Sequence, residues 1–171
     1  IRLGYSRKAE STKKKSKHNG HYDTPKELGK KWQMDVKYVP SACYAGEDGE
    51  KFYQYTMLEE ASRKRFIYAY RETGGYSTCD FVKRAIIWFG YAPDIIQTDN
   101  GGEFTHTKKT KRIHPFDSLC AELHITHKLI RPRTPWHNGK VERSHRNDQE
   151  PFYNHLSFYS YEDLQIQMKR Y

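Results

Sequence analysis

Three carboxylic acids of this sequence lie in settings from which they could act together. Asp35 lies within WQMDVKYV, Asp99 begins TDNGGEF, and Glu142 lies within TPWHNGKVERSHR. Three acids that met at one point would repel one another unless a cation lay between them. In a chain with a formal net charge of +9, the natural candidates are divalent metal ions and the phosphate chemistry that they support.

The local sequence predicts a different support for each acid. From Trp32 to Tyr38 apolar residues alternate with polar ones, which is the period of a strand and places Asp35 on the face opposite the large apolar side chains. The apolar run DIIQT predicts a buried strand that ends at Asp99, where two glycines soon afterwards would allow a sharp turn. The stretch after Asn138 lacks strand alternation and predicts a helix that carries Glu142.

The remaining strands and loops follow from composition. The aromatic-rich runs FYQYTMLEE and RFIYAYRE predict two strands, and THKLIRP predicts the last one. SACYAGEDGE predicts a hairpin loop, and RPRTPWHNG predicts a loop because prolines and glycine break it. Short turns favour antiparallel strands, and intervening helices favour parallel ones. We therefore expect an α/β fold with a mixed five-stranded sheet, three antiparallel strands plus two parallel, flanked by helices.

Two helices are predicted between these strands. The first spans about Thr78 to Phe89, because Ser77 with Asp80 resembles a capping box and Gly90 is a natural stop. The second covers about Pro115 to Leu123, where apolar residues recur at helical spacing.

Two further helices are predicted near the end of the chain. Asn138 is a candidate cap for the helix that carries Glu142, and Pro151 is expected to end or kink it. Ser160 with Asp163 predicts the start of a final helix.

Composition limits the class of protein. The 171 residues suffice for one domain with a core, and the basic surplus indicates a polyanionic partner, most simply nucleic acid, although a soluble domain with a charged surface is the alternative. Three widely spaced cysteines fit a reducing, cytoplasmic compartment. We see no secretory signal and no apolar run long enough to span a membrane. Because the sequence starts at Ile1 and stops within a helical pattern, we expect a fragment of a longer protein.

We expect three parts along the chain. Residues 1–31 are basic and poor in apolar residues, which predicts a flexible arm or linker that either contacts DNA or is simply solvated. Residues 32–159 hold the predicted strands and would form the core domain, which the family resemblance described next implies to be the catalytic core. Residues 160–171 predict a C-terminal helix that is truncated or begins a continuation.

The segments around the three acids together resemble a known family. WQMDVKYVP, DIIQTDNGGEFT and TPWHNGKVERSHR resemble, in this order, the catalytic blocks of DDE transposases and retroviral integrases, and are most similar to those of bacterial insertion-sequence transposases with an integrase-type core. The resemblance covers about Lys31 to Tyr159. The stretch between Asp99 and Glu142 is longer than in many family members, and the basic segment HTKKTKRIH is the expected place of the excess.

This resemblance implies a ribonuclease H-like fold and an enzyme of DNA transposition. Asp35, Asp99 and Glu142 would bind two Mg²⁺ or Mn²⁺ ions, which activate the attacking hydroxyl and stabilise the leaving oxygen. The protein would cut DNA at the ends of a mobile element and join the 3′-hydroxyl to target DNA. Its partners would be both DNAs and further copies of itself, as a homodimer or higher oligomer, in the bacterial cytoplasm next to the nucleoid. We expect neither a membrane nor a small-molecule substrate.

Basic and polar residues near the acids are predicted to contact DNA phosphates. Several lie within about one helical turn of Glu142, His145 among them, and others lie in the loops before that helix. A solvated basic face or a disordered surface tract is the alternative for these groups. The predicted contacts are His137, Asn138, Lys140, Arg143, Arg146, Lys108, Lys109, Lys111, Arg112, Arg131 and Arg133.

Two other functions compete with strand transfer. One is a ribonuclease H-like nuclease that cuts structured nucleic acid without joining it. The other is a nucleic-acid-binding module with a non-functional site. A zinc site at His124 and His127, spaced as HxxH, is disfavoured because no CxxC pair accompanies them.

Overall fold

The computed structural model describes residues 24–171, apart from 47–48, 109 and 132–133. In this part of the chain five strands form one sheet. They are β1 (Trp32–Tyr38), β2 (Tyr53–Glu59), β3 (Arg65–Tyr70), β4 (Ile95–Thr98) and β5 (Thr126–Leu129).

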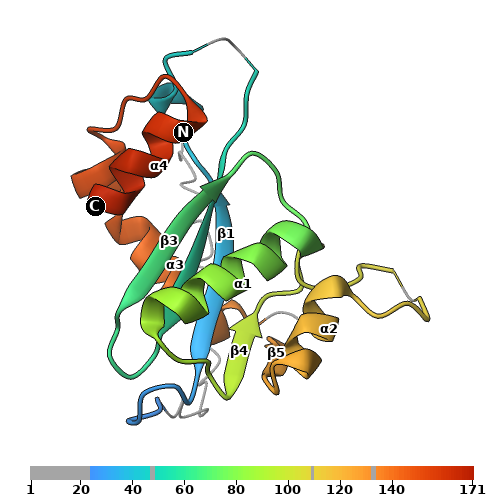
Figure 1. Ribbon diagram of the computed structural model, residues 1–171. Coiled ribbons are helices and arrows are strands. Elements are labelled where there is room, and N and C mark those ends of the chain that lie inside the picture. Colours follow the sequence, from blue (N-terminus) through green and yellow to red (C-terminus); the bar gives the residue numbers. More distant parts are fainter. Residues whose placement is uncertain (1–23, 47–48, 109, 132–133) are drawn as a thin grey trace, which may run out of the picture.

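The strand order across the sheet is β3-β2-β1-β4-β5 (Figure 1). The first three strands are antiparallel, with Asp35 opposite Thr56, whereas β4 runs parallel to β1 and β5 runs parallel to β4. The predicted mixed sheet of three antiparallel and two parallel strands is therefore confirmed, and β1 lies at its centre.

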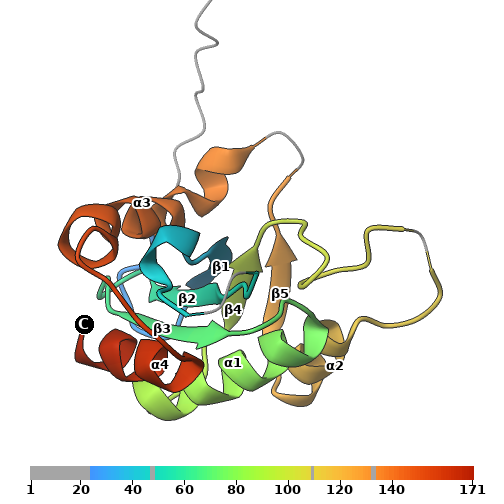
Figure 2. The same cartoon turned by 90° about the horizontal axis from the view of Figure 1, so that it is seen from above.

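Helices cover both faces of the sheet (Figure 2). The first two pack on one face and against each other, the third packs on the opposite face over β1 and β2, and the fourth packs against the edge strand β3. They are α1 (Gly75–Phe89), α2 (Pro115–Glu122), α3 (Gly139–Asn147) and α4 (Tyr161–Arg170).

The main core lies between the sheet and α1. Trp32 and Met34 of β1 are fully buried there with Phe81, Val82 and Ala85 of α1. Burying side chains of this kind contributes about 1.5–3 kcal/mol for each large one. The alternating pattern of β1 thus turns its even-numbered residues into this core and its odd-numbered residues, Asp35 among them, toward α3.

The face of the sheet that meets α3 is polar yet buried. Gln33, Gln54 and Thr56 have no exposed surface, although their sequence pattern is that of a solvated strand face. Gln33 Nε2 donates to Glu60 Oε1 (2.9 Å), and Gln33 Oε1 accepts from the Val141 amide (3.1 Å). Hydrogen bonds therefore hold α3 in register on β1, because each buried polar group needs a partner.

The edge strand β3 is protected by α4. The side-chain amide of Gln165 donates to the Ala69 carbonyl (2.7 Å) and accepts from the Ala69 amide (3.4 Å), and the Tyr161 hydroxyl donates to the same carbonyl (2.9 Å). Leu164 and Met168 pack in a second apolar cluster beside β3. The Gln165 side chain thus makes the hydrogen bonds that a neighbouring strand would make to Ala69, and this part of the sheet edge is not open to pairing with another strand.

The predicted start of α1 was wrong by three residues. The helix begins at Gly75, and the Ser77 hydroxyl donates to Glu72 (3.4 Å) instead of forming a capping box with Asp80. The predicted end is confirmed, because Gly90 adopts a left-handed φ of 80° and its amide donates to the Ile86 carbonyl (2.9 Å). The second predicted helix ends at Glu122, and the His114 ring caps its start by accepting from the Phe116 amide (3.3 Å).

Other local predictions had mixed outcomes. The predicted loop RPRTPWHNG contains a 3-10 helix at Pro135–Asn138, and the predicted hairpin loop contains another at Ser41–Cys43. Pro151 lies within a π-helical turn, Gln149–Tyr153, that follows the end of α3. The start of α4 is confirmed, because the Ser160 hydroxyl accepts from the Asp163 amide (3.2 Å).

The division of the chain into arm, core and C-terminal helix stays a prediction. Residues 1–23 of the predicted arm lie outside the part that the structure describes. Within that part, none of the helices has the length and apolar character needed to cross a membrane.

Candidate active site

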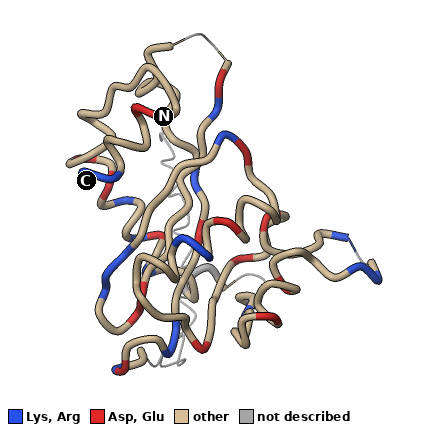
Figure 3. Tube along the Cα trace, in the orientation of Figure 1, with Lys and Arg blue, Asp and Glu red and all other residues tan. Residues whose placement is uncertain are grey.

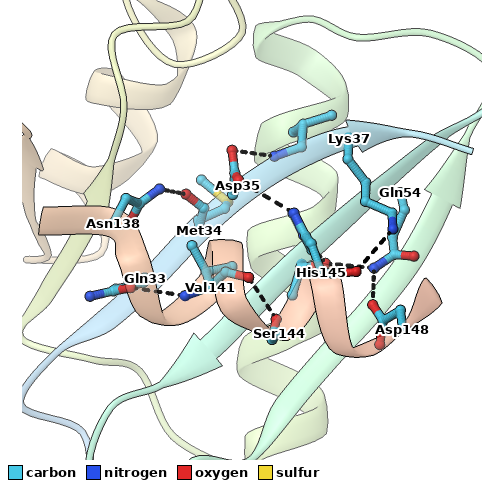
Figure 4. A network of polar contacts seen from close by, with 12 residues as sticks. Gln33, Met34, Asp35, Lys37, Gln54, Asn138, Val141, Ser144, His145 and Asp148 are labelled. Carbon is cyan, nitrogen blue, oxygen red and sulfur yellow. Dashed lines mark hydrogen bonds and ion pairs between the residues drawn. The ribbon is translucent and has the colours of Figure 1, made fainter. Parts of the chain in front are cut away.

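Asp35 lies in the middle of β1, beneath α3. Its side chain is only 17% exposed; Oδ1 accepts from the Val36 amide (2.9 Å), and Oδ2 lies 3.4 Å from Nδ1 of His145 (Figure 4). Burial, then the negative charges of Asp99, Glu142 and Glu103, raise the pKa of Asp35 to about 7. Acids from separate elements are therefore close enough to Asp35 to disfavour its ionised form.

Asp99 directly follows β4 and is held by its own turn. Its Oδ1 accepts from the Gly101 amide (2.9 Å), which fixes the carboxylate relative to the backbone. The turn is anchored on both sides, because Asn100 Nδ2 donates to the Ile130 carbonyl (3.2 Å) and Phe104 is fully buried in the core. The end of a central strand thus carries a rigidly placed acid.

Glu103 is a fourth acid that the sequence reasoning missed. Its carboxylate folds back over the turn, so that a Cβ on Gly101 would lie 2.7 Å from Glu103 Oε1. Burial and, to a smaller extent, the charge of Asp99 raise the pKa of Glu103. The sequence feature that could have pointed to Glu103 is its position four residues after Asp99 in the glycine-containing turn TDNGGEF, where the chain reverses direction.

Glu142 lies in the first turn of α3 and is half-buried. It acts on Asp35 through its charge, but in the part of the chain that the structure describes no three acidic, His or Cys side chains are close enough together to hold a metal ion. Asp35, Asp99 and Glu142 are thus brought to one region without meeting at one point.

His145 faces the interior and not DNA. It is buried; its Nε2 lies 2.8 Å from the Thr56 hydroxyl, and its Nδ1 faces Asp35. Burial, reinforced by the positive charge of Lys37, lowers the pKa of His145 to about 4, so the ring is neutral at physiological pH. The expectation that His145 contacts DNA phosphates was wrong, because one turn of α3 places residue 145 on the sheet side.

Three of the predicted DNA contacts have structural partners. Lys140 forms an ion pair with the buried Glu60, and the backbone carbonyl of His137 accepts from Gln97 Nε2 (2.6 Å). The Asn138 side chain does not cap α3; it is buried, and its Nδ2 donates to the Met34 carbonyl (3.2 Å). These residues fix the start of α3 against β1.

The other predicted contacts that the structure describes are exposed. Arg143 and Arg146 lie on the outer face of α3, away from the sheet. The loop that precedes α2 projects from the body of the molecule and carries Lys and Arg at its tip (Figure 3). Lys109 and Arg133 lie outside the described residues. The exposed predicted contacts are Lys108, Lys111, Arg112, Arg131, Arg143 and Arg146.

A buried relay supports the backbone of Asp99. His127 Nδ1 lies 2.6 Å from Asp117 Oδ1, and its Nε2 lies 2.9 Å from the Thr98 hydroxyl. That hydroxyl donates to the Asp99 carbonyl (2.9 Å). His127, one of the HxxH pair, thus serves to connect α2 and β5 to the end of β4.

The acids of the site have the chemistry of cation ligands. Carboxylates from β1, the β4 turn and α3 lie near one another, and carboxylate oxygen is the preferred ligand of Mg²⁺ and Mn²⁺. A cation among them would offset the repulsion that raises the pKa of Asp35. The donor atoms therefore suit a divalent metal, but in the described part of the chain three such side chains do not meet at one point.

The fold is that of ribonuclease H-like integrase cores. A chain of the simian T-cell lymphotropic virus intasome, solved in complex with PP2A regulatory subunit B56 gamma, matches with a TM-score of 0.64 at 18% identity, over 87% of this chain and 50% of that one. The HTLV-2 integrase catalytic core domain in complex with magnesium matches in its dimeric form with a TM-score of 0.53 at 22% identity, over 70% of this chain and 66% of the other. The trimeric form of the same domain matches with a TM-score of 0.55 at 19% identity, over 83% of this chain and 81% of the other.

The chain belongs to the integrase core domain family. One model of the integrase core domain matches residues 25–135, and a second matches residues 123–171. A putative integrase, ORF3 of Spiroplasma virus SpV1-C74, is 32% identical over an alignment of 144 residues that covers 77% of this chain. This chain spans only 38% of that relative's length. The expected bacterial insertion-sequence origin stays a prediction.

Proposed function

We propose that this chain is the catalytic domain of a DNA transposase or integrase, with Asp35, Asp99 and Glu142 as ligands of two Mg²⁺ or Mn²⁺ ions. The observation that carries the proposal is the gathering of carboxylates from three elements in a member of the integrase core family: Asp99 and Glu142 lie near enough to the half-buried Asp35 for their charges to raise its pKa. A protein gains nothing in stability from gathering buried acids in this way, so their function is the better explanation.

The protein's own residues would orient the reacting groups. The sheet fixes Asp35, the Asx turn at Gly101 fixes Asp99, and α3 presents Glu142 from the opposite side. When bound, the metal ions would activate a water or a DNA 3′-hydroxyl and stabilise the leaving oxygen. DNA ends and target DNA are the proposed substrates, and the relatives solved as dimer, trimer and intasome support a homo-oligomer.

A strand-transfer assay tests this function. Purified protein is mixed with Mg²⁺ and a duplex that carries a labelled 3′-hydroxyl end, and both cleaved and joined products are measured. Asp35→Asn, Asp99→Asn and Glu142→Gln should each abolish both products while the fold is retained. Glu122→Gln, which changes an exposed acid on α2, is the matched control and should leave both unchanged.

Two results would contradict the proposal. A folded Glu142→Gln variant with full joining activity would remove Glu142 from the site. Cleavage without any joining by the wild-type protein would favour the ribonuclease H-like nuclease instead.

A further inference from the structure

A groove beside Glu142 has five basic residues and one acid among the residues that line it. It lies between α3 and the hairpin that joins β2 to β3, and its volume is about 790 Å³. Arg63 and Arg65 line it from the hairpin, and Arg143 and Arg146 line it from α3. We call it the hairpin groove. Of the three acids of the candidate site, Glu142 is among its lining residues and Asp35 and Asp99 are not.

Three of these arginines have charges that the protein does not neutralise. The side chains of Arg63, Arg143 and Arg146 are exposed, and in the described part of the chain none of them makes an ion pair or hydrogen bond. Arg65, in contrast, forms an ion pair with the buried Asp148. Glu142 is the acid among the lining residues, so the groove carries a net positive charge.

Buried contacts fix the two walls of the groove relative to each other. Arg65 Nη1 donates to the Ser144 carbonyl (3.3 Å) as well as to Asp148, which ties β3 to α3. Lys140 of α3 pairs with the fully buried Glu60 at the start of the hairpin. The free arginines therefore project from a preorganised frame, which lowers the entropy lost on binding.

Arg63 occupies a backbone position that favours glycine. Its φ is 64°, in the left-handed region, where the Arg63 amide donates to the Glu59 carbonyl (3.0 Å) at the hairpin turn. Residues other than Gly, Asn and Asp are disfavoured in this region. Arg63 therefore lines the groove from a backbone conformation that is unfavourable for an arginine.

We propose that the hairpin groove binds the sugar–phosphate backbone of DNA and that Arg63 is a phosphate contact. Planar guanidinium groups bind phosphate oxygens in pairs, and three guanidinium groups without an ion-pair partner in the described part of the chain line this groove. The proposal rests on and deepens the proposed function, because Glu142 is among the residues that line the groove, so the bound strand would pass the carboxylate site. Binding here needs no metal and no chemistry, so it is measured separately from catalysis.

The test removes the charge of Arg63 without harming the turn. Affinity for a labelled DNA duplex is measured by fluorescence anisotropy in EDTA at salt concentrations between about 50 and 200 mM. Arg63→Gly should bind about three- to tenfold more weakly and show a salt slope smaller by about 1, because one phosphate contact is lost. Its melting temperature should equal or exceed that of the wild type, and Arg63→Lys should retain the salt slope.

Lys51→Ala is the matched control, because Lys51 is an exposed cation just before β2, at the end of that strand opposite the hairpin. It should change affinity less than twofold. Wild-type affinity and an unchanged salt slope in Arg63→Gly would overturn the proposal. Equal weakening of binding to a poly-glutamate peptide would also overturn it, because the groove would then accept acidic chains in general. Loss of joining by Glu142→Gln with wild-type DNA affinity in EDTA would support the proposal, because binding in the groove would then be separable from the carboxylate site.

Discussion

Asp35 and His145 lie side by side, yet their surroundings favour the neutral form of both. Burial and Asp99 raise the pKa of Asp35 to about 7, whereas burial and Lys37 lower that of His145 to about 4. Between these values the 3.4 Å contact is one between neutral groups and not an ion pair. A nearby cation would lower the pKa of Asp35 and favour its ionised form. This is the behaviour expected of the proposed metal ligand.

The raised pKa of Asp35 predicts how stability depends on pH without metal. Because the folded protein holds this proton up to about pH 7 and the unfolded chain only to about 3.8, the stabilisation is complete below pH 4 and is lost by pH 7. The loss is on the order of 4 kcal/mol. The asparagine of the Asp35→Asn variant does not titrate, so this variant lacks the loss of stability at high pH. In urea unfolding in EDTA, its free energy of unfolding should exceed that of the wild type at pH 8, and the difference should vanish toward pH 4. A difference that is independent of pH would contradict the assignment.

The relay behind Asp99 predicts a second effect. Thr98→Val keeps the shape of the side chain but removes the hydroxyl that joins His127 to the Asp99 carbonyl. We expect a loss of about 1–3 kcal/mol in the free energy of unfolding, because buried polar groups lose their partner. Thr126→Val on β5, where the side chain is exposed, is the control and should cost less than about 0.5 kcal/mol. Equal costs for the two variants would show that the relay contributes nothing.

At the scale of elements, two residues that look alike in sequence act differently. Ser160 and Asn138 both precede a helix, and both were predicted to cap it. Ser160 does so, because its oxygen needs only the Asp163 amide three residues away. Asn138 instead donates to Met34, which is distant in sequence and adjacent only once β1 and α3 have packed. Local pairs can be predicted from sequence, whereas a polar side chain that a tertiary partner recruits cannot.

Aspartate substitutions separate these two roles. Ser160→Asp should change stability by less than about 0.5 kcal/mol, because aspartate caps helices as well as serine does. Asn138→Asp should cost more than about 2 kcal/mol, because it replaces a buried donor by an acid facing the Met34 carbonyl. Chemical denaturation measures both. Tolerance of Asn138→Asp would mean that Asn138 acts as a cap after all.

At the scale of the whole molecule, the sequence predicted the fold because strand and helix periods are clear in it. It did not predict that a polar layer lies buried beneath α3. Gln33, Gln54 and Thr56 have the pattern of an exposed face, and they are buried only once α3 and the π-helical turn that follows it have docked. Glu103 was missed for a similar reason, since its approach to Asp99 depends on how the turn at Gly101 folds back.

The net charge of +9 predicts DNA binding dominated by phosphate contacts. Affinity should therefore fall steeply between about 50 and 200 mM salt, with a slope set by the number of phosphates neutralised. Titration of a labelled duplex at several salt concentrations measures this. A flat salt profile would count against any DNA path across this surface.

The central claim is that Asp35, Asp99 and Glu142 together bind two metal ions. A crystal structure of the protein soaked in Mn²⁺ at pH 8, where Asp35 is ionised, tests it through the anomalous signal of the metal. We predict two peaks about 3.5–4 Å apart, with Asp35 between them and Asp99 and Glu142 as further ligands. Absence of peaks at Asp35, or metal held by Glu103 while Glu142 stays apart, would contradict the account.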